Sequence, residues 1–253
     1  MLLKTINTEK LKTYIYSTRA EMGRAAADAA AAAIREVIAK KGEANVIFAA
    51  APSQNETLAS LLESGTDFSR INAFHMDEYA GLGLEDSQSF ARYLNDHIFS
   101  KAPFKSVNLI PAKLDVDEAC RAYGELLEKF PPDVVLMGIG ENGHIAFNDP
   151  PVADFNDPKL IKKVELDSVC RMQQVHDGCF PTFDDVPKYA LTLTVPALMS
   201  AKHLICTVPA PTKAAAVKAM LEGEYGEVCP ATALRKHEDA RMFLDRDSAA
   251  QVL

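Results

Sequence analysis

Segments typical of buried strands alternate with helical segments along the whole of this 253-residue chain. The strand candidates are short apolar runs at residues 45–51, 72–76, 133–139, 189–195, 202–209 and 241–244. Helical patterns occupy residues 19–40, 53–63, 117–129 and 211–223, and a further one carries Phe90 to Ile98 after a cap at Asp86 or Ser87. This alternation predicts an α/β fold with a mostly parallel sheet and helices on both faces. No segment looks like an interdomain linker, so we expect one domain over residues 1–253.

The composition excludes several classes of protein. The formal net charge is −8 and no Lys/Arg-rich block interrupts the acidity, so we expect no nucleic-acid partner. The first eight residues are too short and polar for a signal peptide, and no run of eighteen apolar residues exists. We therefore expect a cytoplasmic protein without a membrane partner. The five cysteines are scattered and lack metal-ligand spacing, which favours reduced core thiols over disulfides or structural zinc.

Four unusual segments stand at the carboxyl ends of predicted strands, at residues 52–54, 77–78, 138–144 and 209–213. Parallel α/β sheets bind their ligands in crevices beyond these strand ends. The chemistry of the four segments is therefore expected to converge, although they lie far apart in the sequence.

The segment Gly138–His144 carries the strongest chemical signal. Its three glycines let the backbone come close to a ligand, and N–H groups such as that of Gly143 can hold an anion. The imidazole of His144 can exchange protons near neutral pH. Asp149 can accept a hydrogen bond from one ring nitrogen of His144 and so fix the tautomer. The alternative is a tight turn followed by a core histidine.

The other three segments offer a base and ligands for a phosphate. Asp77 and Glu78 are adjacent carboxylates suited to general-base work, although a solvated acidic turn would have the same sequence. Lys213 opens a helix after a strand, where the helix dipole and its own charge favour a phosphate; the alternative is a surface lysine. Ser53 and Gln54 open a helix in the same way, and Ser53 is either a phosphate ligand or an N-cap.

Two of these segments resemble the signature segments of glucosamine-6-phosphate deaminases. They are MDEYAGL at Met76–Leu82 and GIGENGHIAFNDP at Gly138–Pro150. Shorter matches lie at residues 88–90, 187–192 and 213–223, so the resemblance runs from about residue 45 to residue 243.

The resemblance implies a modified Rossmann-like fold and an aldose–ketose isomerisation coupled to loss of ammonia from an amino-sugar phosphate. Asp77 matches the base that moves a proton between C2 and C1 of the opened sugar, and His144 matches the histidine that assists ring opening. Lys213 and Arg171 match phosphate-binding residues, and the Ser53 loop takes the place of the first phosphate loop. No metal or organic cofactor is implied, and the implied partner is a small phosphorylated sugar.

The sequence departs from the family pattern in two places. Asn142 replaces one of the two acids that usually flank the histidine, and Asp149 stands where a longer glutamate is common. An amide can hold the ring but does not stabilise its cationic form as a carboxylate does. The loop at residues 49–54 lacks the usual glycines, which predicts a looser grip on phosphate. The allosteric-site residues of hexameric relatives have no match, so we expect no activation by N-acetylglucosamine 6-phosphate.

Three functional hypotheses remain. The first is an isomerase and deaminase acting on glucosamine 6-phosphate or galactosamine 6-phosphate. The second is a hydrolase of the 6-phosphogluconolactonase type, which needs no carbon base and hence no Asp77. The third is a catalytically weak sugar-phosphate-binding protein, motivated by Asn142 and the glycine-free loop. Residues 150–187 lack clear periodicity and predict a long loop that acts as a lid. Whether the protein forms a homo-oligomer stays an open question.

Overall fold

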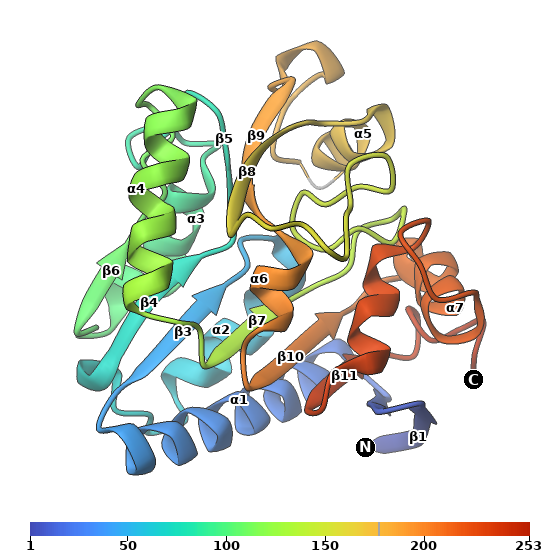
Figure 1. Cartoon of the computed structure of the whole chain (residues 1–253). Helices are drawn as coiled ribbons and strands as arrows, with labels where there is room; N and C mark the ends of the chain where they lie inside the picture. The colour runs from blue at the N-terminus through green and yellow to red at the C-terminus, as the bar shows by residue number, and fades with distance from the viewer. Residues whose placement is uncertain (177) are drawn as a thin grey trace.

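The computed structural model describes residues 1–176 and 178–253, and its main element is an eight-stranded sheet (Figure 1). The strands are Leu2–Thr8 (β1), Leu11–Tyr16 (β2), Ala44–Phe48 (β3), Ile71–His75 (β4), Ser106–Asn108 (β6), Val134–Met137 (β7), His203–Val208 (β10) and Ala240–Leu244 (β11). Their order is β1-β2-β11-β10-β7-β3-β4-β6. All neighbouring pairs are parallel except β1 and β2, which form an N-terminal hairpin that the sequence patterns did not predict. The mostly parallel sheet is confirmed.

Helices cover both faces of this sheet, as expected (Figure 1). They are Arg19–Lys41 (α1), Asn55–Leu62 (α2), Phe90–His97 (α3), Val116–Lys129 (α4), Ser168–His176 (α5), Val195–Met199 (α6) and Ala214–Glu222 (α7). Successive strand residues point to opposite faces. Val46 and Phe48 of β3 share a core with α1, α2 and α3, whereas Ile47 shares the other core with α4, α6 and α7. Helix α3 is capped by Ser89, whose side chain accepts the N–H of Arg92, and not by Asp86 or Ser87.

A second, antiparallel sheet stands beyond the ends of the main strands. It consists of Asp77–Tyr79 (β5), Ile161–Glu165 (β8) and Tyr189–Leu193 (β9), in the order β5-β9-β8. The strand predicted at residues 189–195 is present as Tyr189–Leu193, but it lies in this small sheet, because an apolar run shows that a strand is buried but not which sheet it joins. Only Met76 separates β4 of the large sheet from β5 of the small one. Position 77 is thus the first residue of the small sheet.

The segment at residues 150–187 is more than a loop. It contributes strand β8 and helix α5 to the fold, while residue 177 lies outside the described residues. Asp167 precedes α5, and its Oδ1 accepts the N–H of Cys170 at 2.6 Å. The five-residue strand and nine-residue helix are too short to give a clear hydrophobic period. Closure of the segment as a lid stays a prediction.

Small side chains let helix α1 approach α2 closely. Ala26, Ala27 and Ala30 are fully buried. A Cβ atom built on Gly23 would stand 2.3 Å from Cβ of Glu56, so the helices touch through backbone at this point. This approach brings Arg19, the first residue of α1, beside the start of α2.

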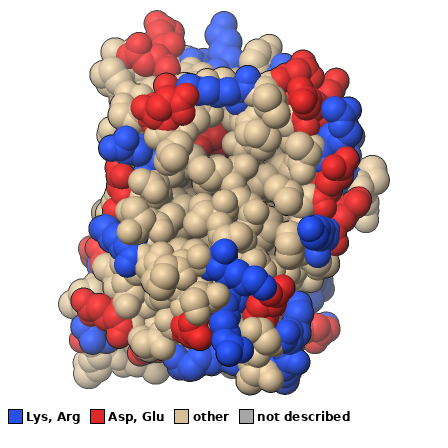
Figure 2. All heavy atoms as spheres, turned by 90° about the vertical axis from the view of Figure 1, so that its left-hand side faces the viewer, with Lys and Arg blue, Asp and Glu red and all other residues tan. Residues whose placement is uncertain are grey.

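The distribution of surface charge and the state of the cysteines agree with the expectations from the composition. On the face that Figure 2 shows, Lys and Arg side chains are interspersed with Asp and Glu and form no continuous basic surface. Within the described residues, no helix has both the length and the apolarity that a membrane crossing requires. All five cysteines are unbridged thiols, three of them buried, as expected.

Candidate active site

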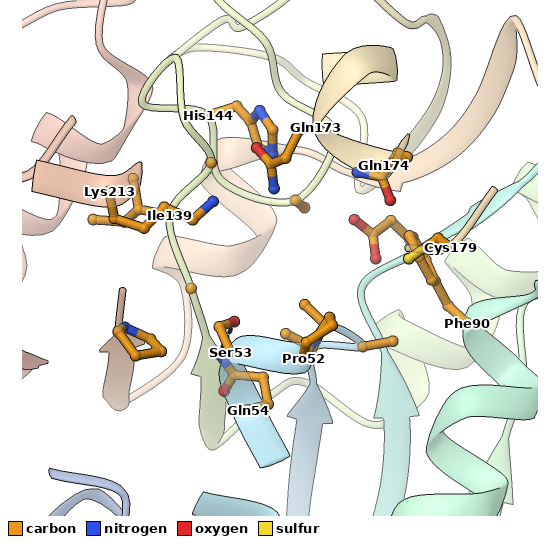
Figure 3. A pocket seen from close by; sticks show the side chains of 18 of the residues that line it. Pro52, Ser53, Gln54, Phe90, Ile139, His144, Gln173, Gln174, Cys179 and Lys213 are labelled. Carbon is orange, nitrogen blue, oxygen red and sulfur yellow. Dashed lines mark hydrogen bonds between the residues drawn. The ribbon is translucent and has the colours of Figure 1, made fainter. Parts of the chain in front are cut away.

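A cavity opens where strands β3, β7 and β10 of the large sheet end (Figure 3). All four segments that the sequence placed at strand ends contribute to its lining. In Figure 3, Pro52, Ser53 and Gln54 lie below the cavity, His144 lies above it, and Lys213 lies at the left. The predicted convergence is therefore confirmed.

Asp77 lines the cavity at the junction of the two sheets. Its backbone pairs with Thr192 of β9, and only 7% of the residue is exposed. Burial raises the pKa of the Asp77 carboxyl well above its ordinary value, and the nearby charge of Glu78 adds to the shift. A carboxyl group with a raised pKa in a cavity is a strong proton acceptor, as a carbon base must be.

His144 is held by two acceptors on the same ring nitrogen. Its Nδ1 lies 2.9 Å from Oδ1 of Asp149 and 2.8 Å from Oδ1 of Asn142. Because both neighbours accept, the proton belongs on Nδ1, and Nε2 is left with its lone pair for the cavity that the ring lines. Although burial opposes it, hydrogen bonds from His144 and Asn142 hold the pKa of Asp149 below its ordinary value. The predicted contact between Asp149 and His144 is therefore present, and it favours the tautomer with the proton on Nδ1.

Two short 3₁₀ helices carry the groups suited to a phosphate. Pro52–Gln54 (η1) follows β3 and presents Ser53, and Pro211–Lys213 (η5) follows β10 and presents Lys213. The Nε2 of Gln54 lies 3.3 Å from the carbonyl oxygens of both Met137 and Thr207. Gln54 thus ties η1 to the ends of β7 and β10, which positions Ser53 beside the cavity.

Comparison with known proteins agrees with this geometry. A family model for glucosamine-6-phosphate isomerases and 6-phosphogluconolactonases matches residues 17–243. The chain belongs to this family. A glucosamine-6-phosphate deaminase of Bacillus cereus is 35% identical over 217 residues, which cover 85% of this chain and 80% of the relative. One of Bacillus cytotoxicus is 31% identical over the same length.

Solved structures of the family share the fold. A monomeric glucosamine-6-phosphate deaminase aligns with a TM-score of 0.87 and 30% identity, covering 94% of this chain and 99% of its own. A 6-phosphogluconolactonase of Thermotoga maritima aligns with a TM-score of 0.76 and 20% identity, covering 93% and 100%. The modified Rossmann-like fold is confirmed. Because the relatives above 30% identity are deaminases, the expectation of an enzyme of the deaminase/isomerase type is confirmed as well.

Glu78 does not line the cavity with Asp77, contrary to the expectation that either of the two adjacent carboxylates could act there as a base. Its carboxylate accepts three backbone N–H groups, from Tyr79 at 2.9 Å, Phe90 at 3.1 Å and Ala91 at 2.8 Å. Burial raises the pKa of Glu78 to about 7, although these donors favour the anion. Alternation along β5 turns neighbouring side chains to opposite sides, so only one of the two carboxylates can face the sugar site.

Gly143 has a structural role in the glycine-rich turn at residues 138–144. Its φ is +83°, and its N–H donates to the carbonyl oxygen of Gly140 at 3.1 Å. It is not among the described residues that line the cavity. The expectation that its N–H binds an anion is therefore wrong, because the turn itself uses that group.

Arg171 is also turned away from the family's sugar site. Its Nη2 donates to the carbonyl oxygens of Phe183 at 2.8 Å and Val186 at 2.9 Å, and the guanidinium stacks on the Phe183 ring. Among the described residues, the arginine that lines the cavity is Arg19. Its Nε lies 2.8 Å from Oε1 of Glu56, and its Nη2 donates to the carbonyl oxygen of Pro52.

Sequence reasoning also missed two glutamines of helix α5. Gln173 and Gln174 line the cavity on the side of His144 (Figure 3). Oε1 of Gln173 accepts the N–H of Glu141 at 2.9 Å, and Oε1 of Gln174 accepts the hydroxyl of Tyr79 at 2.7 Å. These bonds fix the carbonyl ends of both amides. No motif marked these residues, because α5 itself was not predicted.

Three metal-ligating atoms lie near the family histidine. Those of His144, Asp149 and Cys170 stand within 4.8 Å of one another. The Nδ1 to Oδ1 separation between His144 and Asp149 is 2.9 Å, shorter than the roughly 3.3 Å between two ligands of a tetrahedral zinc ion. This contact is a hydrogen bond, and burial raises the pKa of the Cys170 thiol, which keeps it protonated. The absence of a metal requirement stays a prediction.

Proposed function

We propose that this chain is an amino-sugar-phosphate deaminase/isomerase that converts glucosamine 6-phosphate to the ketose 6-phosphate and ammonia. The observation that carries the proposal is that Asp77 and His144 line the same cavity as Lys213. A carboxyl group, an imidazole with an available Nε2 and a phosphate-binding cation are the groups that this reaction needs. The deaminase relatives support the substrate class.

The phosphate is bound at the large-sheet side of the cavity. Lys213 supplies a cation at the end of β10, and Ser53 supplies a hydroxyl at the end of β3. Arg19 supplies a second cation from the first turn of α1. Two cations from different elements suit a dianionic phosphate, and a guanidinium adds paired N–H donors.

Catalysis begins with ring opening by His144. Nε2 accepts the proton of the anomeric hydroxyl and returns it to the ring oxygen, while Asp149 stabilises the imidazolium formed in between. Asp77 then removes the proton from C2 of the open-chain aldehyde while the carbonyl oxygen at C1 takes a proton from the C2 ammonium group, and Asp77 delivers the C2 proton to C1 of the resulting enolamine. The product is an imine at C2, and water hydrolyses it to the ketone and ammonia. Gln173 and Gln174 line the same cavity, where amide groups can stabilise the charge that develops in these steps.

The test is release of ammonia and formation of ketose 6-phosphate from glucosamine 6-phosphate and galactosamine 6-phosphate, assayed separately. Asp77→Asn is expected to abolish turnover, and His144→Gln to lower it strongly when the sugar must first open. Asp117→Asn, an exposed acid on α4, is the matched control and should retain full activity.

The same proteins distinguish the alternatives. A lactonase would hydrolyse 6-phosphogluconolactone and would be insensitive to Asp77→Asn, because lactone hydrolysis removes no carbon-bound proton. Binding of the sugar phosphates without turnover by folded wild-type protein would establish a binding role. Either result would overturn the proposal.

A further inference from the structure

Every hydrogen-bonding group of the Asn142 amide is engaged. Its Oδ1 accepts from the backbone N–H of His144 at 3.0 Å and from Nδ1 of the same residue at 2.8 Å. Its Nδ2 donates to Oδ1 of Asp149 at 2.9 Å and to Oδ2 of Asp167 at 3.2 Å. The amide orientation is therefore determined, because the NH₂ group must face the two carboxylates and the oxygen must face the histidine.

Asp167 connects this network to helix α5. Its other oxygen, Oδ1, accepts the N–H of Cys170, and its carbonyl accepts the N–H of Arg171 at 3.0 Å. Helix α5 in turn supplies Gln173 and Gln174 to the cavity wall. The bond between Asn142 and Asp167 thus joins the loop that holds His144 to the helix on the same side of the cavity.

We infer that Asn142 and Asp167 form a positioning pair, in which the amide at 142 is required because the carboxylate of Asp167, the residue before α5, faces it. The pair fixes the His144 ring relative to helix α5. An aspartate at position 142 would set its carboxylate against those of Asp149 and Asp167, and such contacts between like charges are unfavourable in a buried site. The inference depends on the proposed function only for its activity readout.

Four proteins test the pair. Asn142→Asp places two acceptors face to face, and Asp167→Asn places two donors face to face. The double variant Asn142→Asp/Asp167→Asn restores one donor and one acceptor across the contact between positions 142 and 167, with their roles exchanged, while the carboxylates at positions 142 and 149 still face each other. Asparagine caps a helix about as well as aspartate, so the start of α5 is preserved. Asp115→Asn is the matched control, because Asp115 caps α4 in the same manner and lies outside the cavity.

Each single variant is expected to lose about tenfold in kcat/KM. The double variant is expected to recover about threefold relative to Asn142→Asp, because the contact between positions 142 and 167 is restored while the carboxylates at positions 142 and 149 still face each other. Hydrogen exchange of the α5 amides is expected to speed up in the single variants and to slow again in the double variant. Asp115→Asn should match the wild type in both measurements.

A further readout separates positioning from stability. The titratable groups around the contact are His144, Asp149, Asp167 and Cys170. The double variant sets a second carboxylate beside Nδ1 of His144, which favours the imidazolium. Its His144 resonance should therefore titrate at higher pH than in the wild type, a change that a loss of packing alone would not produce.

The inference is overturned if Asn142→Asp alone matches the wild type, or if the double variant is no better than Asn142→Asp. These outcomes are distinct from failure of the proposed function. If the wild type turned over no sugar phosphate, hydrogen exchange and the His144 titration in the same four proteins would still decide whether the pair exists.

Discussion

The imidazole ring of His144 occupies the space that a side chain at position 140 would need. A Cβ atom built on Gly140 would stand 2.1 Å from Cε1 of His144 and 2.3 Å from each ring nitrogen. The ring cannot retreat without breaking its contact with Asp149. Glycine at this position is therefore a condition for the catalytic geometry, in addition to any role in the turn.

Gly140→Ala is accordingly expected to displace His144 and to lower kcat by about 100-fold, the usual cost of moving a catalytic group by an ångström. The effect should be measured as initial rates at saturating substrate, with folding checked by circular dichroism. Gly226→Ala is the control, since a Cβ atom there meets nothing within 4 Å. Equal kcat values for the two variants would contradict the expectation.

Asp77→Asn is expected to stabilise the protein while it abolishes turnover. The raised pKa means that folded Asp77 holds its proton more tightly than the unfolded chain does, so ionised Asp77 opposes folding above the ordinary pKa of about 3.9. The melting temperature of the variant should exceed that of the wild type by a few degrees at pH 8. The difference should shrink as the pH falls toward 4, where both side chains are neutral. A lower melting temperature at pH 8 would refute this account of Asp77.

Glu78→Ala should have the opposite effects, because it should destabilise the protein and leave turnover largely intact. It leaves the N–H groups of Phe90 and Ala91 without their acceptor at the buried start of α3. Loss of these bonds is expected to lower the free energy of unfolding by about 2–4 kcal/mol, measured by urea denaturation. Turnover by the folded fraction should stay within about tenfold of the wild type, because Glu78 does not line the cavity. Complete loss of turnover in folded protein would assign Glu78 a direct role.

Arg19→Gln is expected to raise KM by about 10- to 100-fold with little change in kcat, which is the range of a charge-assisted hydrogen bond to phosphate. Inhibition by inorganic phosphate should weaken in parallel. Arg171→Gln is the matched control, because its guanidinium binds backbone carbonyls of its own segment. The assignment fails if Arg171→Gln raises KM and Arg19→Gln does not.

The groups that could be predicted are those whose local sequence carries their chemistry. Glycine-rich residues after an apolar strand marked His144, and the strand-end rule brought it together with Asp77, Ser53 and Lys213. The direction of the strands alone brings these four residues to the same edge of the sheet, so no knowledge of side-chain packing is needed to predict it.

The groups that were missed depend on contacts between distant segments. Arg19 reaches the cavity only because Gly23 lets α1 approach α2, and a glycine inside an alanine-rich helix was the available signal. Arg171 was misplaced because a motif aligned along the chain does not give the direction of a side chain. The strand at Asp77–Tyr79 was not predicted, since three residues are too few to display alternation.

The single residue between β4 and β5 sets the small sheet directly beyond the large one, and this arrangement bears on the length of substrate that the cavity accepts. Asp77 belongs to the small sheet, whereas Lys213 and Ser53 follow strands of the large one. The two sheets share no strand among the described residues. In the proposed reaction, the distance from the carbon that exchanges its proton to the phosphorus atom therefore depends on the position of one sheet relative to the other. We therefore expect the framework to discriminate between sugar phosphates of different chain length, independently of the hydroxyl groups that any one side chain contacts.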